Sequence, residues 1–451
     1  MLLALLAIGN LAHSATIAWT NSSGGNWSVA ANWSPNQVPT NTDTVLITST
    51  NTYTVILDAS ESFSSIVTNV VSLTLGAGGG AAGMQTFLVT NLTPSSVFCL
   101  SSQLLVTNGG VFQLTNGNLQ ANSMIIANGG VFNMAASSLY GNVTVAGGGV
   151  LNATGYNYAF GAVTVASGGV LNPSPLYLYG PSTNFGTINL TNGPGLSIIH
   201  DGTPNAHGGL INQAGGLINF LSDQVGIAGG GYLVNQGGIT KSAGTGLNVI
   251  DVQFATNSGT ITAQTGQMIL AGQWTLLPSG SLNVVLNSAT NYGSFFFYLY
   301  NSGNPPPPPI PGNAGLAGAF NATLTNGYVP TNGTTFNVLS YGSYSGNFNS
   351  LGLPAGATWQ STFSATNLTL TAGGGKPQFG TFMLSGTNLV FNGTGGTAGS
   401  NYVILVSTNL TIPLTNWLAV ITNTFDGAGQ FHYTNNVSPV KPRQFFNFKL
   451  P

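Results

Sequence analysis

Charge is the scarcest property of this 451-residue sequence. Only 3% of its residues are Asp, Glu, Lys or Arg, against roughly 25% in ordinary globular domains. A groove that tracks a nucleic-acid backbone needs a cation for each phosphate that it neutralises, and the whole chain has five Lys plus Arg. A basic helix on a membrane surface needs similar clustering. The composition therefore argues against both a nucleic-acid partner and an electrostatically bound membrane.

Cysteine is almost absent as well. Cys99 is the only one, so no disulfide can form within the chain. A reactive or metal-binding thiol requires cationic neighbours, and the apolar run 97–100 supplies none. We therefore interpret Cys99 as a small buried hydrophobic residue. The sequence also has no phosphate-binding loop, no zinc-protease motif and no calcium nonapeptide repeat, so it predicts no cofactor.

Long apolar runs are missing too, because no stretch reaches the roughly 18 residues typical of a membrane-spanning helix. The apolar stretch at residues 2–8 is too short to cross a bilayer, and Ala12 and Ser14 offer the small side chains that a signal peptidase reads. We expect residues 1–14 to be a secretory signal peptide, although the usual positive start is missing. The alternative for this segment is a buried first strand. The mature chain is expected to have no transmembrane segment.

Glycine, in contrast, is abundant, at 64 residues, and part of it is periodic. A short apolar burst precedes each copy of the tripeptide Gly-Gly-Val, and another follows it. The copies are spaced by 20, 19 and 20 residues, at 109–111, 129–131, 148–150 and 168–170. Two short strands joined by a glycine corner describe one coil of a parallel β-helix, in which each coil buries its inner face by stacking on the next.

Beyond residue 180 the repeat continues with a different rhythm of asparagine, glycine and an apolar residue. This rhythm recurs at Asn184, Asn212, Asn235 and Asn257, at intervals of 28, 23 and 22 residues. The longer first interval predicts an inserted loop around 200–207. Further on, five consecutive prolines within 301–312 cannot occupy a central strand and indicate a stiff loop or linker.

These patterns predict an all-β chain, a right-handed parallel β-helix (solenoid) followed by a small C-terminal antiparallel β-sandwich. Turn signals in the last segment separate six expected strands, at 382–384, 389–391, 402–407, 417–422, 430–434 and 444–450. The expected segments are a signal peptide (1–14), an N-terminal capping segment (15–59), the β-helix repeats (60–285), the end of the solenoid with a Pro-rich loop and an antiparallel β region (286–375), and the C-terminal module (376–451).

Three segments carry residues typical of a known class of proteins. They are Gly25, Trp27, Asn32, Trp33, Pro39 and Asp43 near the start, 327–330, 333–339 and Trp359 after the repeats, and 401–405, Asn416, Trp417 and 442–446 near the end. The first two segments resemble bacterial secreted β-helix proteins with autotransporter-passenger-like repeats. The last resembles a C-terminal β module found on large exported bacterial proteins. The resemblance implies a secreted or cell-surface protein that serves adhesion, matrix or polysaccharide contact.

An enzyme of the same architecture is an alternative, because many β-helix proteins cleave acidic polysaccharides with clustered carboxylates. The best residual cluster here consists of His200, Asp201, His207 and Asp223, and the two aspartates are 22 residues apart, about one coil. Such residues could bind a metal or share protons. Asp201-Gly202 also fits a plain turn, which we favour, so we assign no catalytic residue and no metal.

Trp27 and Trp33 are the candidate ligand-binding residues, because exposed aromatic rings stack on sugars. The interpretation that we favour is that they close the open end of the first coil as an apolar cap. We therefore predict an exported structural or adhesive scaffold, at the cell surface or in the extracellular matrix, without catalytic activity. The alternatives are a carbohydrate-binding β-helix protein and a polysaccharide-degrading β-helix enzyme. Polysaccharide and cell-surface or matrix components are the expected partners.

Overall fold

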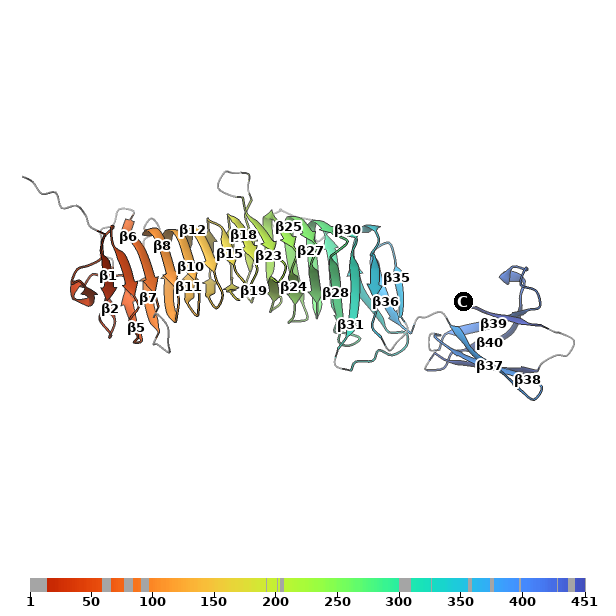
Figure 1. Ribbon diagram of the computed structural model, residues 1–451. Helices are drawn as coiled ribbons and strands as arrows, with labels where there is room; N and C mark the ends of the chain where they lie inside the picture. Colours follow the sequence, from red (N-terminus) through yellow and green to blue (C-terminus); the bar gives the residue numbers. More distant parts are fainter. Residues whose placement is uncertain are drawn as a thin grey trace, which may run out of the picture.

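The computed structural model describes residues 14–58, 66–76, 84–90, 97–191, 193–200, 202, 207–299, 310–325, 327–355, 359–373, 377–396, 399–427, 429–436 and 443–450. Three features expected above lie outside these residues: the signal peptide up to residue 13, Asp201 and the proline run. The described residues form an elongated solenoid of strands followed by a small C-terminal module (Figure 1). No helix in the described part is long and apolar enough to cross a membrane.

Two long sheets form the solenoid. One has 20 strands: β1 (Thr16–Trp19), β3 (Trp33–Ser34), β4 (Thr44–Ile47), β6 (Ile66–Leu75), β8 (Val97–Val106), β10 (Asn118–Ile126), β12 (Ser138–Val145), β14 (Asn157–Ala159), β15 (Val163–Val165), β17 (Leu176–Leu178), β18 (Pro181–Asn184), β20 (Leu196–Ile198), β21 (Gly209–Asn212), β23 (Gly226–Asn235), β25 (Leu247–Asn257), β27 (Gly266–Leu276), β29 (Gly293–Tyr298), β32 (Thr335–Ser340), β35 (Trp359–Phe363) and β36 (Asn367–Ala372).

The other has 14 strands: β2 (Gly25–Asn26), β5 (Tyr53–Ile56), β7 (Gln85–Thr90), β9 (Gly110–Thr115), β11 (Val131–Ala135), β13 (Val150–Thr154), β16 (Val170–Asn172), β19 (Thr187–Leu190), β22 (Leu217–Phe220), β24 (Gly238–Lys241), β26 (Thr260–Ala263), β28 (Ser281–Leu286), β31 (Ala319–Leu324) and β34 (Ser350–Gly352). Short pieces complete the fold: the 3₁₀ turns Ala30–Asn32 and Leu414–Asn416, and the paired strands β30 (Asn313–Leu316) and β33 (Ser343–Gly346).

Successive coils stack in parallel and in register. In the 14-stranded sheet Val111, Val131, Val150 and Val170 occupy one column, and the strands of this sheet pair only in parallel along its described length. Fourteen strands at a spacing of about 4.8 Å give a rod roughly 60 Å long. A single apolar core of buried side chains runs inside the solenoid from Ile17 to Leu370. The predicted parallel β-helix is therefore confirmed.

The paired glycines occupy one corner of the solenoid. Gly109, Gly129, Gly148 and Gly168 all have positive φ, between 75° and 82°, a conformation that other residues rarely adopt. A Cβ on the following glycine would lie 2.1–2.5 Å from a backbone carbonyl oxygen of the preceding coil, for example 2.1 Å from Ile126 O in the case of Gly149. The first glycine thus permits the turn, and the second permits the close approach of two backbones.

The end of the solenoid differs in part from the expected antiparallel region. β31 and β34 extend the 14-stranded sheet in parallel, because their side chains continue the apolar columns of β28. β32 pairs in parallel with β29, and only then does the chain reverse, since β36 pairs antiparallel with both β32 and β35. The antiparallel strands therefore close the last coil rather than form a region of their own.

The C-terminal module is a sandwich of two antiparallel three-stranded sheets. One sheet contains β37 (Gln378–Ser385), β38 (Asn388–Thr394) and β41 (Phe431–Asn436), and the other contains β39 (Asn401–Ser407), β40 (Leu418–Thr424) and β42 (Phe445–Lys449). All six strands predicted from the sequence are present. Their common core is largely aromatic: Phe391, Tyr402, Ile404, Phe425, Phe431 and Tyr433.

The interpretation of Cys99 as a buried residue is wrong. Its side chain is only partly buried, because side chains of a strand alternate between the two faces of the sheet. Phe98 and Leu100 point into the core, so Cys99 between them points outward. Partial burial still raises the pKa of its thiol, which disfavours the reactive thiolate.

Candidate functional site

The two N-terminal tryptophans lie inside the first coils. Trp27 and Trp33 are only 4% and 2% exposed. The indole of Trp33 donates a hydrogen bond from Nε1 to the carbonyl of Trp27 at 2.8 Å, and the two ring centroids are 4.8 Å apart. The ring of Trp27 also contacts Phe87, with centroids 5.4 Å apart. Both rings are thus packed into the core, and a sugar cannot reach either of them in this conformation.

The proposed acidic and histidine cluster is not brought together in the described residues. His200 and His207 face each other across an isolated antiparallel bridge, with ring centroids 5.9 Å apart. The carbonyl oxygen of His200 lies beside Gly230, whereas Asp223 precedes the start of the same strand, β23. The strand from Gly226 to Gly230 alone spans roughly 13 Å, and Asp223 lies in the turn that precedes it. The ion pair of Asp223 is with Lys241 and not with either histidine.

Asp223 has a different partner. Its carboxylate accepts a hydrogen bond from Lys241 Nζ at 2.6 Å and one from the backbone N–H of Gly246 at 2.9 Å. The Lys241 hydrogen bond is the main cause that lowers the pKa of Asp223. Lys241 itself is fully buried and also donates to Asn248 Oδ1 and to the carbonyl of Ala243. This ion pair holds the turn after Lys241 against the solenoid. The charges of Asp223 and Lys241 therefore have a structural role that requires no catalytic one.

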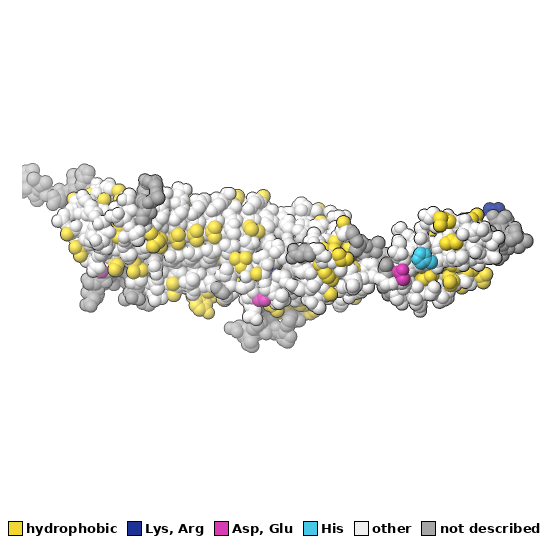
Figure 2. Space-filling view, turned by 90° about the horizontal axis from the view of Figure 1, so that it is seen from below, with side chains coloured by type: hydrophobic (Ala, Val, Ile, Leu, Met, Phe, Trp, Pro, Cys, Tyr) yellow, Lys and Arg dark blue, Asp and Glu magenta, His cyan; other side chains and the backbone are white. Residues whose placement is uncertain are grey.

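No group of three or more His, Cys, Asp or Glu side chains in the described part of the chain could hold a metal ion. Figure 2 shows one face of the molecule, on which acidic, basic and histidine side chains occur only at a few separated points. What the surface offers instead is aromatic and amide groups. These are arranged by the stacking of the coils.

Six aromatic side chains gather on the outer face of three consecutive coils, and we call this group the aromatic ladder. Its members come from or adjoin β12, β14 and β17: Tyr140, Tyr156, Tyr158, Phe160, Tyr177 and Tyr179. They alternate along their strands with buried residues such as Leu139, Ala159 and Leu178, so their side chains face solvent. Register places them in columns, since Tyr158 pairs with Tyr177. The ladder is a surface feature that sequence reasoning missed.

The rings of the aromatic ladder stack on one another. Tyr140 and Phe160 are nearly parallel, with centroids 4.7 Å apart and planes inclined by 10°. Phe160 and Tyr179 follow at 4.8 Å, and Tyr158 and Tyr177 at 5.1 Å. Because the ring faces are turned toward one another, their edges and phenol hydroxyls are turned to solvent. Tyr156, at 61% exposed, is the most open ring.

Partial burial raises the pKa of the Tyr177 phenol, and the nearby hydroxyls of Tyr156, Tyr158 and Tyr179 raise it further. The Tyr177 phenol therefore stays neutral at physiological pH and can both donate and accept a hydrogen bond. The backbone N–H of His207 donates to the carbonyl of Tyr179 at 3.0 Å, so His207 lies beside this surface.

A row of amides lines the outer face of the 14-stranded sheet. Each amide donates to the one in the preceding coil: Asn152 to Asn133 at 2.8 Å, Asn172 to Asn152 at 2.7 Å, Asn189 to Asn172 at 3.1 Å and Asn219 to Asn189 at 3.2 Å. All five are half-buried, so each retains hydrogen-bonding capacity toward solvent. The surface is therefore neutral, polar and repetitive along the rod.

The signal for the aromatic ladder is present in the sequence. Tyr140, Phe160 and Tyr179 are spaced by 20 and 19 residues, and Tyr158 and Tyr177 by 19. These are the intervals of the glycine pairs, so the same period that predicts the coils also predicts that these rings stack.

Comparison of the chain with protein families and with curated proteins finds no match in either set.

Proposed function

We propose that this protein is an exported, non-catalytic scaffold of bacterial origin, at the cell surface or in the extracellular matrix. The observation that carries the proposal is the uninterrupted parallel stacking of the solenoid, which yields a rod roughly 60 Å long from a 14-stranded sheet. Over five successive coils of this sheet an outward asparagine amide recurs and bonds to the one before it. A rod of this kind spaces its ends and presents one type of contact many times over, as an adhesive or matrix component requires.

Exposure outside the cell tests this proposal. Antibodies against the purified chain should label intact producing cells, or their surrounding matrix, as strongly as permeabilised cells. Labelling that appears only after permeabilisation would overturn the assignment. A cytoplasmic control protein, labelled only after permeabilisation, shows that the intact cells remain closed.

The aromatic ladder favours a second, related function: contact with neutral polysaccharide. Its row of phenol hydroxyls can exchange hydrogen bonds with sugar hydroxyls. The spacing of about 5 Å between rings recurs over the three coils of the ladder, so a chain of sugars that lies along the axis can make the same contact on each of these coils. The scarcity of charge supports a neutral polymer over an acidic one.

A panel of insoluble neutral polysaccharides, including cellulose, starch, xylan and mannan, tests this contact by co-sedimentation. At least one should retain the wild-type protein. Tyr156→Ala combined with Tyr158→Phe and Tyr177→Phe removes the most open ring and two hydroxyls, and should weaken retention about tenfold. Tyr298→Phe, in β29 of the same sheet and several coils beyond the ladder, is the matched control. Unchanged retention in the triple variant would contradict the role of the ladder.

A further inference from the structure

The C-terminal module has a surface feature that the scaffold function does not use. Its central strand β39 is apolar on both faces of its sheet. Tyr402 and Ile404 point into the module core, with 1% and 0% exposed, while Val403 and Leu405 point to the other side. Strands that are apolar on both faces are normally covered on both. Here the second face is covered only in part by the chain itself.

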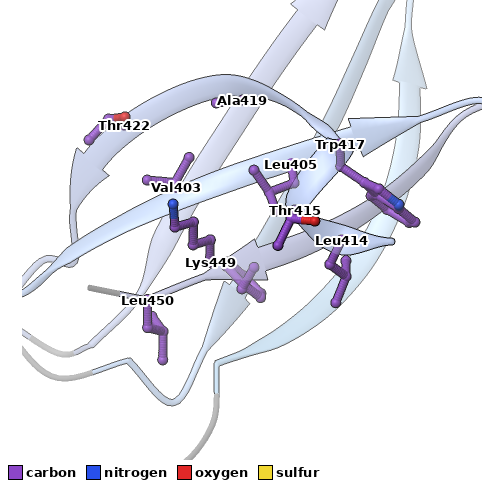
Figure 3. Close-up of a pocket in the computed structure, with 10 residues that line it drawn as sticks. Val403, Leu405, Leu414, Thr415, Trp417, Ala419, Thr422, Lys449 and Leu450 are labelled. Atoms are coloured by element: carbon purple, nitrogen blue, oxygen red, sulfur yellow. The ribbon is translucent and has the colours of Figure 1, made fainter. Parts of the chain in front are cut away.

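The segment between β39 and β40 folds back along this second face and forms one wall of a hollow. The hollow has a volume of about 580 Å³, within the range of small-molecule sites, which is about 300–1,000 Å³. Val403, Leu405 and Ala419 form its floor, and Leu414 and Trp417 stand at its side (Figure 3). The indole Nε1 of Trp417 donates to the carbonyl of Ile412 at 3.0 Å, which fixes this wall.

Lys449 supplies the only charge among the residues that line the hollow. Its side chain extends across the sheet toward Val403 (Figure 3), consistent with the direct pairing of these two residues in β42 and β39. It makes no ion pair with any described carboxylate. The chain has only five Lys plus Arg. Because one of these cations lies at the rim of the apolar hollow, the hollow favours a ligand that carries a negative charge.

We propose that this hollow binds a single long-chain carboxylate, a free fatty acid, with its acyl chain on the floor formed by Val403, Leu405 and Ala419. The carboxylate pairs with the Lys449 ammonium, and Thr422, which lines the hollow and pairs with Val403 in the same row of the sheet, offers a hydroxyl to the same head group. Burial of the acyl chain supplies most of the affinity, and the exposed ion pair selects an anionic over an uncharged head. The site is on the C-terminal module and does not depend on the polysaccharide contact.

Isothermal titration of the full-length protein with dodecanoate and with dodecanol tests the proposal. The wild type should bind dodecanoate more tightly than dodecanol. Lys449→Gln should weaken dodecanoate binding by up to about fivefold and leave dodecanol binding unchanged. Ala419→Trp, at an exposed position of an edge strand where an aromatic residue is well tolerated, should fill the hollow and abolish both. Leu418→Trp adds the same ring one residue away, at an exposed position outside the hollow, and should bind as the wild type does.

Equal affinity for acid and alcohol in the wild type, or binding that survives Ala419→Trp, would overturn the proposal. So would association with phosphatidylglycerol vesicles in the absence of dodecanoate binding, because that result would identify the exposed leucines around the hollow as a membrane-contact surface instead. Circular dichroism of each variant shows whether the module remains folded. A variant that unfolds is replaced by Ala419→Phe, which fills less of the hollow.

Discussion

The solenoid and the C-terminal module stabilise their β-structure in different ways. In the solenoid, residues of the same type stack on one another in successive coils. Examples are the valine column that begins at Val111 and the amide row that begins at Asn133. In the module, strands of unlike sequence pair antiparallel around six buried residues, five of them aromatic. Large apolar side chains such as Met383 and Leu384 remain 60% and 71% exposed there. The stacked repeats of the solenoid thus bury a continuous apolar core, whereas the short module leaves apolar side chains exposed, where a ligand can contact them.

The largest loss of stability is expected on substitution of Phe391 in the module core. Phe391 lies at its centre and contacts Phe382, Phe431, Tyr433 and Phe446. Phe391→Ala should destabilise the module by about 3–5 kcal/mol and unfold it while the solenoid persists. Limited proteolysis should then release an intact solenoid fragment. Loss of both regions together would show that they form one cooperative unit and would break the comparison.

In the solenoid the largest effect should come from the ion pair between the buried Lys241 and the partly exposed Asp223. Asp223→Asn leaves the fully buried Lys241 without its carboxylate, and this should cost about 3 kcal/mol in urea unfolding. The double variant Asp223→Leu with Lys241→Met should restore most of the loss, since it leaves no buried charge. A single variant within about 0.5 kcal/mol of the wild type would contradict this account.

The same pair predicts an acid limit for the solenoid. The Lys241 hydrogen bond lowers the pKa of Asp223 below its ordinary value, so the folded state holds this proton less tightly than the unfolded chain. Its contribution to stability is therefore present above that value and is lost as the pH falls through the lowered pKa. Urea midpoints of the wild type should drop in this acid range, and those of the double variant should drop less.

A smaller loss of stability should distinguish the asparagines buried inside the solenoid from those in the half-buried row on its outer face. Asn184, Asn212, Asn235 and Asn257 are fully buried and donate to one another at 2.7 Å. Asn212→Ala leaves the amides on both sides of it without this partner and should cost about 1–3 kcal/mol. The matched control is Asn172→Ala in the half-buried outer row, where water replaces the lost partner and the cost should stay below about 0.5 kcal/mol. Equal losses in urea unfolding would refute the distinction.

The smallest expected effect is a gain in stability. Burial raises the pKa of Asp251, and its Oδ1 is buried without a hydrogen-bond partner in the described structure. The folded state therefore disfavours the ionised form, and stability is lost as the pH rises above the unfolded value. Asp251→Asn should raise the thermal midpoint at neutral pH and change little at pH values where the carboxyl is protonated. A lower midpoint at neutral pH would mean that the carboxylate has a stabilising role.

The fold could be predicted from the sequence because its period is local. Each glycine pair marks a corner by its own conformational freedom, and each apolar burst marks a strand, so four copies are enough to define the coil. The six module strands were visible for the same reason, since turns such as Asp426-Gly427 separate them. The ion pair of Asp223 was not visible, because it depends on how the turn after Lys241 folds back onto the solenoid.

The candidate site was predicted less well than the fold. Trp27 and Trp33 attract attention as tryptophans, yet their burial follows from the need to cover the open end of the first coil. Tyr140 and the rings stacked on it are the more accessible candidates for ligand contact. Their spacing of 19 and 20 residues could be recognised in the sequence. What the spacing could not supply was the alternation that places Tyr158 outside while Asn157 and Ala159 lie inside, because short strands do not fix which residues face the core.

The salt dependence of polysaccharide binding tests the central claim most directly. If a neutral rod binds neutral sugars through phenol and amide groups, retention of the full-length protein on its best neutral polysaccharide should be the same at low and at high salt, since exposed charge contributes nothing that salt can screen. Retention that collapses as salt is added, or that appears only on acidic polysaccharides such as alginate, would contradict the account.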